Sequence, residues 1–305
     1  MKWIVAALAI VLAAFVLVWH LRRDGRAPLP PGLRVGDAPG EYVNLRDGSV
    51  LVFVPGGRFT MGNPAVEGSR PHEETLAGSF IGKVPVTNAA FERFVKETGY
   101  ETDAERGKAS TFTLSDGRNW VGTAGLSWRK PGAASAPPDH PVVFVTWNDA
   151  SAYCRWAGLD LPTEALWEKA AVWDPEKRAA RLYPWGDVPP GPGTPRFANV
   201  ADEAFARAFP LRQGPGELGV FVGYEDGFVG TSPVGAFPAG ASCHGALDMT
   251  GNVEQWCATL RPDGRRATRG TGFGSYRKDL PAAREGGTPP DWARADLGFR
   301  VARAD

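Results

Sequence analysis

Residues 245–256, which read G-A-L-D-M-T-G-N-V-E-Q-W, form the most informative segment of this chain. Asp248, Asn252 and Gln255 place three side-chain oxygens within eight residues. Oxygen ligands without a nearby thiol or imidazole pair suit a hard cation such as Ca²⁺. A polar turn that hydrogen-bonds to itself between two buried strands explains the same residues. The segment alone therefore leaves both interpretations open.

The composition favours a globular α+β protein. Apolar residues make up 43% of the 305-residue chain, with 11 Trp and 16 Phe, which can build a sizeable core. The 34 basic and 34 acidic side chains cancel, so the sequence offers no electrostatic footprint for nucleic acid. The 38 Gly and 27 Pro favour turns and irregular loops over long helices. We expect one contiguous domain at residues 41–305.

The cysteines do not form a recognisable metal or redox motif. Cys154, Cys243 and Cys257 show no C-x-x-C spacing. At most one disulfide bond can form within the chain, and Cys243 and Cys257 are the nearer pair in sequence. Three free buried thiols are the alternative.

The N-terminal segment has the features of a membrane anchor. Residues 3–19 are uninterrupted apolar sequence, and seventeen residues are the lower limit for a membrane-spanning helix. No small-x-small cleavage site follows, so we predict an uncleaved single-pass anchor at residues 1–23. Residues 24–40, rich in Pro and Gly, are predicted to be a tether. The flanking charges by themselves narrowly favour a body in the cytoplasm.

The first half of the domain carries clear local signals. Residues 50–54 and 58–62, joined by Pro-Gly-Gly, are predicted to form a hairpin. Three short helices are predicted from their caps and apolar faces. They begin at Thr87 or Asn88 and end at Gly99, begin at Thr146 and end at Gly158, and begin after Thr163.

Several phrases, taken together and in order, resemble the formylglycine-generating enzyme, or sulfatase-modifying factor, family. They span nearly all of residues 50–302 and are 54–62, 85–88 with Phe91, 139–142, 147–150, 153–158, 161–164 with 167–168, 183–186, 198–200, 245–256 and 297–300. The resemblance implies one C-type-lectin-like domain with little regular secondary structure, supported by bound Ca²⁺. It also implies a location on the periplasmic or extracellular side of the membrane.

The resemblance further implies two Ca²⁺ sites. The first would use side-chain oxygens and backbone carbonyls of Asn199, Asp226, Val200 and Phe228. The second would use those of Asp248, Gln255, Gly251 and Val253. The family pattern has Asn at the first position of the second site and Glu at the last. Here a carboxylate stands at the first position instead, so the formal charge of the site is kept.

The catalytic cysteines of the family have no counterpart in this chain. Relatives that oxidise a substrate cysteine to formylglycine contain a phrase similar to G-G-S-x-x-C-x-x-x-x-C near the C-terminus. They bind copper through both of its thiolates. The two cysteine positions fall on Ser275 and Leu280, and no cysteine follows Cys257. Because leucine has no ligating atom and Cu(I) prefers sulfur, we expect neither copper binding nor formylglycine formation by the family's mechanism.

A polar cluster occupies the region that carries the active site in the relatives. Its members are Tyr276, Arg277, Lys278, Asp279, Arg284 and Glu285. It is either a solvated loop or a groove for a peptide or small polar ligand. We favour a membrane-anchored, non-catalytic relative that binds a protein, peptide or small polar ligand through this groove. The alternatives are a maturation or biosynthetic oxidase of the same family that uses non-cysteine residues, and a lectin-like scaffold within an envelope assembly.

Overall fold

The computed structural model describes residues 29–115, 119–132, 136–209 and 219–305. The predicted membrane anchor at residues 1–23 and the first part of the predicted tether lie outside this range. Within the described residues, no helix combines the length and the apolar character needed to span a bilayer.

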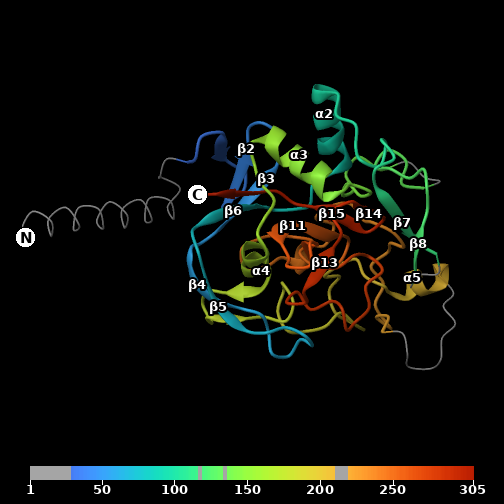
Figure 1. Ribbon diagram of the computed structural model, residues 1–305. Coiled ribbons are helices and arrows are strands. Elements are labelled where there is room, and N and C mark those ends of the chain that lie inside the picture. The colour runs from blue at the N-terminus through green and yellow to red at the C-terminus, as the bar shows by residue number, and fades with distance from the viewer. Residues whose placement is uncertain (1–28, 116–118, 133–135, 210–218) are drawn as a thin grey trace, which may run out of the picture.

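A five-stranded sheet forms one side of the molecule, with the order β1-β2-β3-β6-β16 and antiparallel neighbours throughout (Figure 1). Its strands are β1 Leu33–Val35, β2 Glu41–Asn44, β3 Val50–Val54, β6 Ser79–Gly82 and β16 Ala302–Ala304. The sheet corrects the predicted tether at residues 24–40, because β1 lies inside that segment and pairs Leu33 with Asn44. Leu33 is 8% exposed, so its burial holds β1 against the core despite the surrounding Pro and Gly.

The predicted hairpin between residues 50–54 and 58–62 is wrong. Strand β4, Gly57–Met61, pairs with β5, His72–Leu76, whereas β3 lies between β2 and β6. Gly57 has φ of 117° and turns the chain out of the first sheet. The Pro-Gly-Gly turn was therefore identified correctly, and the pairing that it implied was not.

The three predicted helices are confirmed with their caps. They are α2 Asn88–Thr98, α3 Trp147–Ala157 and α4 Glu164–Val172. Thr87, Thr146 and Thr163 each accept a hydrogen bond from a backbone N–H of the first turn. Gly99 and Gly158 end α2 and α3 in the left-handed conformation. A shorter helix, α5 Glu203–Ala208, and a 3₁₀ turn at Pro238–Gly240 follow.

Two further small sheets contain strands from the C-terminal half of the chain, and one of them also contains two strands from the N-terminal half. One has the order β13-β12-β11-β15, formed by Gly286–Thr288, Arg266–Arg269, Glu254–Leu260 and Leu297–Phe299. The other has the order β14-β7-β8, formed by Trp292–Arg294, Ser110–Leu114 and Trp120–Gly122. Strands β15 and β14 pair in parallel with β11 and β7. A two-stranded ribbon joins β9 Trp173–Asp174 to β10 Ala179–Ala180.

Helix α4 contacts β3 and β6 of the first sheet as well as β11 and β12 of the second (Figure 1). Its Trp167 is fully buried, and the aromatic residues Phe91, Tyr153 and Trp256 fill the core beneath α2 and α3. Long loops cover the rest. The architecture confirms an α+β domain with little regular secondary structure.

Candidate functional site

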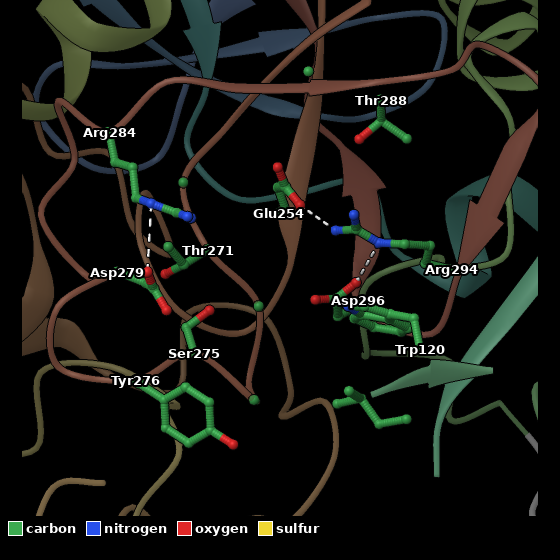
Figure 2. A pocket seen from close by; sticks show the side chains of 15 residues that line it. Trp120, Glu254, Thr271, Ser275, Tyr276, Asp279, Arg284, Thr288, Arg294 and Asp296 are labelled. Atoms are coloured by element: carbon green, nitrogen blue, oxygen red, sulfur yellow. Dashed lines mark hydrogen bonds and ion pairs between the residues drawn. The ribbon is translucent and has the colours of Figure 1, made fainter. Parts of the chain in front are cut away.

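A pocket of about 280 Å³ opens where strand ends of the β13-β12-β11-β15 sheet and the β14-β7-β8 sheet meet the loop after β12 (Figure 2). Strand β11 contributes Glu254 and β14 contributes Arg294. The remaining lining residues come from β7, β8, β13 and the connecting loops; they are Leu114, Trp120, Gly270, Thr271, Gly272, Gly274, Ser275, Tyr276, Asp279, Arg284, Gly287, Thr288 and Asp296.

One wall of the pocket is a cluster of Arg294, Glu254, Asp296 and Trp120, which we call the Arg294 cluster (Figure 2). The Arg294 guanidinium pairs with the Glu254 carboxylate, and its Nε donates to Asp296 Oδ1 at 3.0 Å. Its Cζ lies 4.9 Å from the Trp120 ring centroid, within the range of a cation–π contact. Burial raises the pKa of Asp296, and Arg294 opposes that shift. The cluster therefore keeps two carboxylates next to one fixed cation.

Residue 272 must be glycine because its backbone lies against the Asp296 side chain. A Cβ atom at residue 272 would come within 2.5 Å of both Cβ and Oδ2 of Asp296, closer than two such atoms can approach. By the resemblance, the family has a serine at this position. The Asp296 side chain thus occupies the space that a side chain at residue 272 would need.

The predicted groove residues divide into two groups. Tyr276, Asp279 and Arg284 line the pocket, where Arg284 Nε lies 3.4 Å from Asp279 Oδ1 on the wall opposite the Arg294 cluster (Figure 2). The other three residues do not line it. Arg277 lies over the Phe221 ring and Lys278 is exposed, while Glu285 Oε2 lies 3.3 Å from Arg261 Nη1.

The first predicted cation site, at Asn199, is built from buried oxygens. Asn199 is 1% exposed, and its Oδ1 has no hydrogen-bond partner among the described residues. Asp226, also 1% exposed, accepts backbone N–H groups of Val200 and Phe228, both at 2.8 Å. Burial raises the pKa of Asp226 to about 7, and the nearby Asp202 adds to this shift. A buried oxygen without a donor beside a poorly compensated carboxylate fits a hard cation.

The second predicted cation site, at residues 248–255, is arranged differently. The side-chain amide of Gln255 donates from Nε2 to the Asp248 carbonyl at 2.7 Å and to the Val253 carbonyl at 3.3 Å. The Val253 carbonyl is one of the oxygens that the resemblance assigns to the cation. Gln255 Oε1 faces away from these carbonyls and accepts from Trp167 Nε1 and Arg300 Nε. The Gln255 group that faces the predicted site is therefore an NH2, which cannot ligate a cation, so these residues do not fit Ca²⁺.

Comparison with known proteins agrees with the fold. A model of the sulfatase-modifying factor enzyme 1-like domain matches residues 41–305. This chain belongs to that family. The formylglycine-generating enzyme of Streptomyces coelicolor is 34% identical over 309 residues, covering 87% of this chain and 92% of the relative.

Two further sulfatase-modifying factor relatives differ in their described activities. The mouse protein named inactive Cα-formylglycine-generating enzyme 2 is 36% identical over 282 residues, covering 83% of this chain and 85% of the relative. A hercynine oxygenase of Mycolicibacterium thermoresistibile is 37% identical over 205 residues, covering 65% of this chain and 40% of the relative. Among solved structures, PvdO from Pseudomonas aeruginosa shares the fold, with a TM-score of 0.63 and 24% identity over 88% of this chain and 100% of PvdO.

The cysteine positions of the sulfatase-modifying factor family, as the resemblance places them, lie in two environments. Ser275 lines the pocket, whereas Leu280 is fully buried among Tyr183, Val200 and Phe221. The polar contact of Leu280 is made by its backbone carbonyl, which accepts a hydrogen bond from Thr250 Oγ1 at 2.8 Å. The two side chains therefore do not share one surface of the pocket.

The three native thiols lie elsewhere and are all free. Cys154 and Cys257 are buried in the core, Cys243 is exposed, and none of them lines the pocket that the structure describes. The alternative of a bond between Cys243 and Cys257 is therefore not realised, because the buried Cys257 lies in the core and Cys243 lies at the surface. Burial raises the pKa of the Cys154 and Cys257 thiols, and partial desolvation raises the pKa of Cys243.

Thiol labelling tests the accessibility of the pocket. We expect the folded wild-type protein to react at Cys243 alone, and the Ser275→Cys variant to react at one additional thiol, because Ser275 lines an open pocket. The number of modified thiols is measured with a chromogenic disulfide reagent at pH 8, before and after unfolding in guanidinium. Labelling of Ser275→Cys that requires unfolding would contradict this placement.

The residues of the Arg294 cluster were not among the site residues predicted from the sequence. Arg294 and Asp296 precede the L-G-F-R phrase with one residue between them, and this i, i+2 spacing indicates side chains on one face of an extended segment. This spacing is the sequence signal for the two residues. Trp120 carried no such signal, because it reaches the pocket only through the pairing of β8 with β7 and of β7 with β14.

Proposed function

We propose that this family member binds a small polar ligand, or a polar side chain of a peptide or protein partner, in the pocket beside the Arg294 cluster. We propose further that it does not oxidise cysteine to formylglycine by a copper-dependent route. The ligating atoms that line the pocket support the absence of a copper-dependent route most directly. The fifteen lining residues, all in the described part of the chain, offer oxygens and guanidinium nitrogens but neither a thiol nor an imidazole.

The two walls of the pocket suit a ligand that carries charge. The Arg294 side chain is 12% exposed and is committed to Glu254 and Asp296, so it acts as a fixed part of the wall. On the opposite wall the Arg284 side chain is 53% exposed and only loosely paired with Asp279. Arg284 is therefore free to turn toward an anionic group of a ligand, which leaves Asp279 available to a cationic nitrogen.

We propose that Ca²⁺ supports the domain at the first predicted site. Asn199 Oδ1 and the Asp226 carboxylate, with the backbone carbonyls of Val200 and Phe228, would hold it. These oxygens come from two segments of chain that already meet through the hydrogen bond from Val200 N to Asp226. A hard cation would supply the positive charge that the buried carboxylate lacks and would join the two segments.

We also propose that residues 1–23 anchor the protein in a membrane, with the domain on the periplasmic or extracellular face. The uninterrupted apolar run at residues 3–19 supports the anchor. The family resemblance, rather than the flanking charges, supports the outer face. Accessibility of a cysteine-reactive, membrane-impermeant label to Cys243 in intact cells distinguishes the two orientations.

A peptide assay tests the absence of formylglycine formation. We expect the purified full-length protein in detergent, supplied with copper and oxygen, to leave a cysteine-containing sulfatase peptide unchanged, because its pocket offers no thiol to bind copper or to exchange with the substrate. The measurement is the peptide mass over time. The formylglycine-generating enzyme of Streptomyces coelicolor, assayed in parallel, serves as the active control.

A loss of peptide mass that depends on this protein would contradict the proposal. The existence of a mouse relative named as inactive is consistent with a non-catalytic member of this family. Metal analysis of the purified protein separates the remaining alternatives. Copper or iron at one ion per chain would favour an oxidase built from other residues, whereas calcium alone would favour the binding protein or the lectin-like scaffold.

A further inference from the structure

The side-chain amide of Gln255 has one possible orientation. Its Oε1 accepts hydrogen bonds from Trp167 Nε1 at 2.8 Å and from Arg300 Nε at 2.6 Å. Indole and guanidinium N–H groups can only donate, so the amide oxygen must face them. The amide nitrogen must then face the opposite side, where it reaches the carbonyl oxygens of Asp248 and Val253.

The Arg300 guanidinium binds backbone carbonyls on the inside of the same loop. Its Nη2 donates to the carbonyls of Leu247 at 2.7 Å and Asp248 at 2.9 Å, and its Nη1 donates to the Gly82 carbonyl at 2.6 Å. Arg300 is fully buried, and Asp248, which accepts from Gly235 N at 2.7 Å, is 8% exposed. One guanidinium and one carboxylate therefore balance each other inside the loop.

We propose that the Gln255 amide nitrogen takes the place of a cation, so that residues 248–255 are held by hydrogen bonds and by Arg300 rather than by Ca²⁺. A glutamate at residue 255 would keep the acceptor for Trp167 and Arg300. Its second oxygen would instead face the carbonyl oxygens of Asp248 and Val253. Three converging oxygens and one uncompensated negative charge require a cation. Glutamine replaces that oxygen with a donor and removes the charge.

The loop also supports the pocket. Gly251 has φ of 80°, and a Cβ there would lie 2.6 Å from the Asn199 carbonyl, so the loop packs directly on the first predicted cation site. The Gly251 N–H donates to Thr271 Oγ1 at 3.0 Å, and Thr271 lines the pocket. A loop locked by Gln255 and Arg300 therefore positions one pocket wall without a metal ion of its own.

The Gln255→Glu variant tests the proposal by changing a single amide to a carboxylate. We expect the full-length variant to bind one more calcium ion per chain than the wild type, measured by equilibrium dialysis against a calcium-free reference. We also expect its thermal unfolding midpoint to fall in the presence of a chelator and to recover when calcium is added. The extra ion and the recovery report on the loop and not on pocket ligands.

The Asp226→Asn variant separates this loop from the first predicted site. With Gln255 present, Asp226→Asn should show no calcium-dependent rise in its unfolding midpoint. The Asp226→Asn, Gln255→Glu double variant should regain one. The wild-type protein, whose folding depends on no substitution, should bind at most one calcium ion per chain in the same dialysis measurement.

Two results would overturn the proposal. Two calcium ions bound per wild-type chain, or one that Asp226→Asn retains, would show that the loop holds a cation despite Gln255. A Gln255→Glu variant that is folded but binds no additional ion would show that the amide does not stand in for one. Neither result bears on whether the pocket binds a ligand, so the two proposals fail separately.

Discussion

Replacing Arg294 with methionine is expected to lower the free energy of unfolding by about 3–5 kcal/mol at pH 8, the usual loss when one member of a buried ion pair is removed. Glu254 and Asp296 would remain in the pocket wall with side chains only 17% and 9% exposed and no cation between them. Urea unfolding followed by circular dichroism measures this loss.

The loss should shrink as the pH falls. Burial already raises the pKa of Asp296 and Arg294 opposes the shift, so removing Arg294 raises this pKa further. A carboxyl group with a raised pKa in the folded state binds more protons there than in the unfolded chain, so lowering the pH favours folding. We therefore expect a smaller difference between Arg294→Met and wild type at pH 5 than at pH 8.

Arg265→Met is the matched control. Arg265 makes the same kind of Nε contact, at 2.8 Å to Asp263, but the two side chains are 53% and 48% exposed, so water replaces the lost partner. Little change in stability is expected. An equal loss in both variants, or an Arg294→Met deficit that does not depend on pH, would show that the Arg294 cluster is not a desolvated unit.

The Trp167→Ala variant is also expected to lose about 3–5 kcal/mol of unfolding free energy, as deletions of fully buried aromatic side chains do. Trp167 is 0% exposed at the centre of α4, and its indole N–H donates to Gln255. A Cβ at Gly270 would lie 3.1 Å from its ring, so the ring fills the space behind the loop that enters the pocket. Its removal leaves a cavity between α4 and this loop.

Trp156→Ala provides the comparison for Trp167→Ala. Trp156 lies on the partly exposed face of α3, where Arg46 Cζ lies 5.0 Å from the centroid of its ring. Its truncation should cost less than half as much, measured by guanidinium unfolding under the same conditions. Trp167→Phe, which keeps most of the ring volume and loses the N–H donor, should fall between the two. A loss for Trp156→Ala as large as that for Trp167→Ala would refute the assigned difference in burial.

The sequence predicted what depends on neighbouring residues. Thr87, Thr146 and Thr163 were recognisable as caps because a hydroxyl that accepts an N–H three residues later acts locally. The Pro-Gly-Gly turn at residues 55–57 was equally local, yet its hairpin was wrong. A turn determines that the chain changes direction, whereas hydrophobic burial decides which strand it meets.

The site was harder to predict because its parts are distant in sequence. The polar residues at 276–285 were contiguous and therefore visible, but only Tyr276, Asp279 and Arg284 face the pocket. The opposite wall depends on the parallel pairing of β14 with β7, which brings Arg294 beside Trp120 across more than half of the chain. Parallel pairing between distant strands leaves no pattern in either segment alone. Likewise, the exchange of a carboxylate between residues 255 and 248 was seen, but the role of Arg300 required the folded arrangement.

The order of the strands has a consequence for biosynthesis. Residues 297–304 supply one strand to each of two sheets, since β15 pairs with β11, β16 pairs with β6, and Arg300 lies between them. A ribosome makes these residues after α2, α3, α4 and every other strand of the two sheets. Neither sheet can acquire this strand until residues 297–304 have left the exit tunnel, so the long-range pairing of both sheets forms late in synthesis.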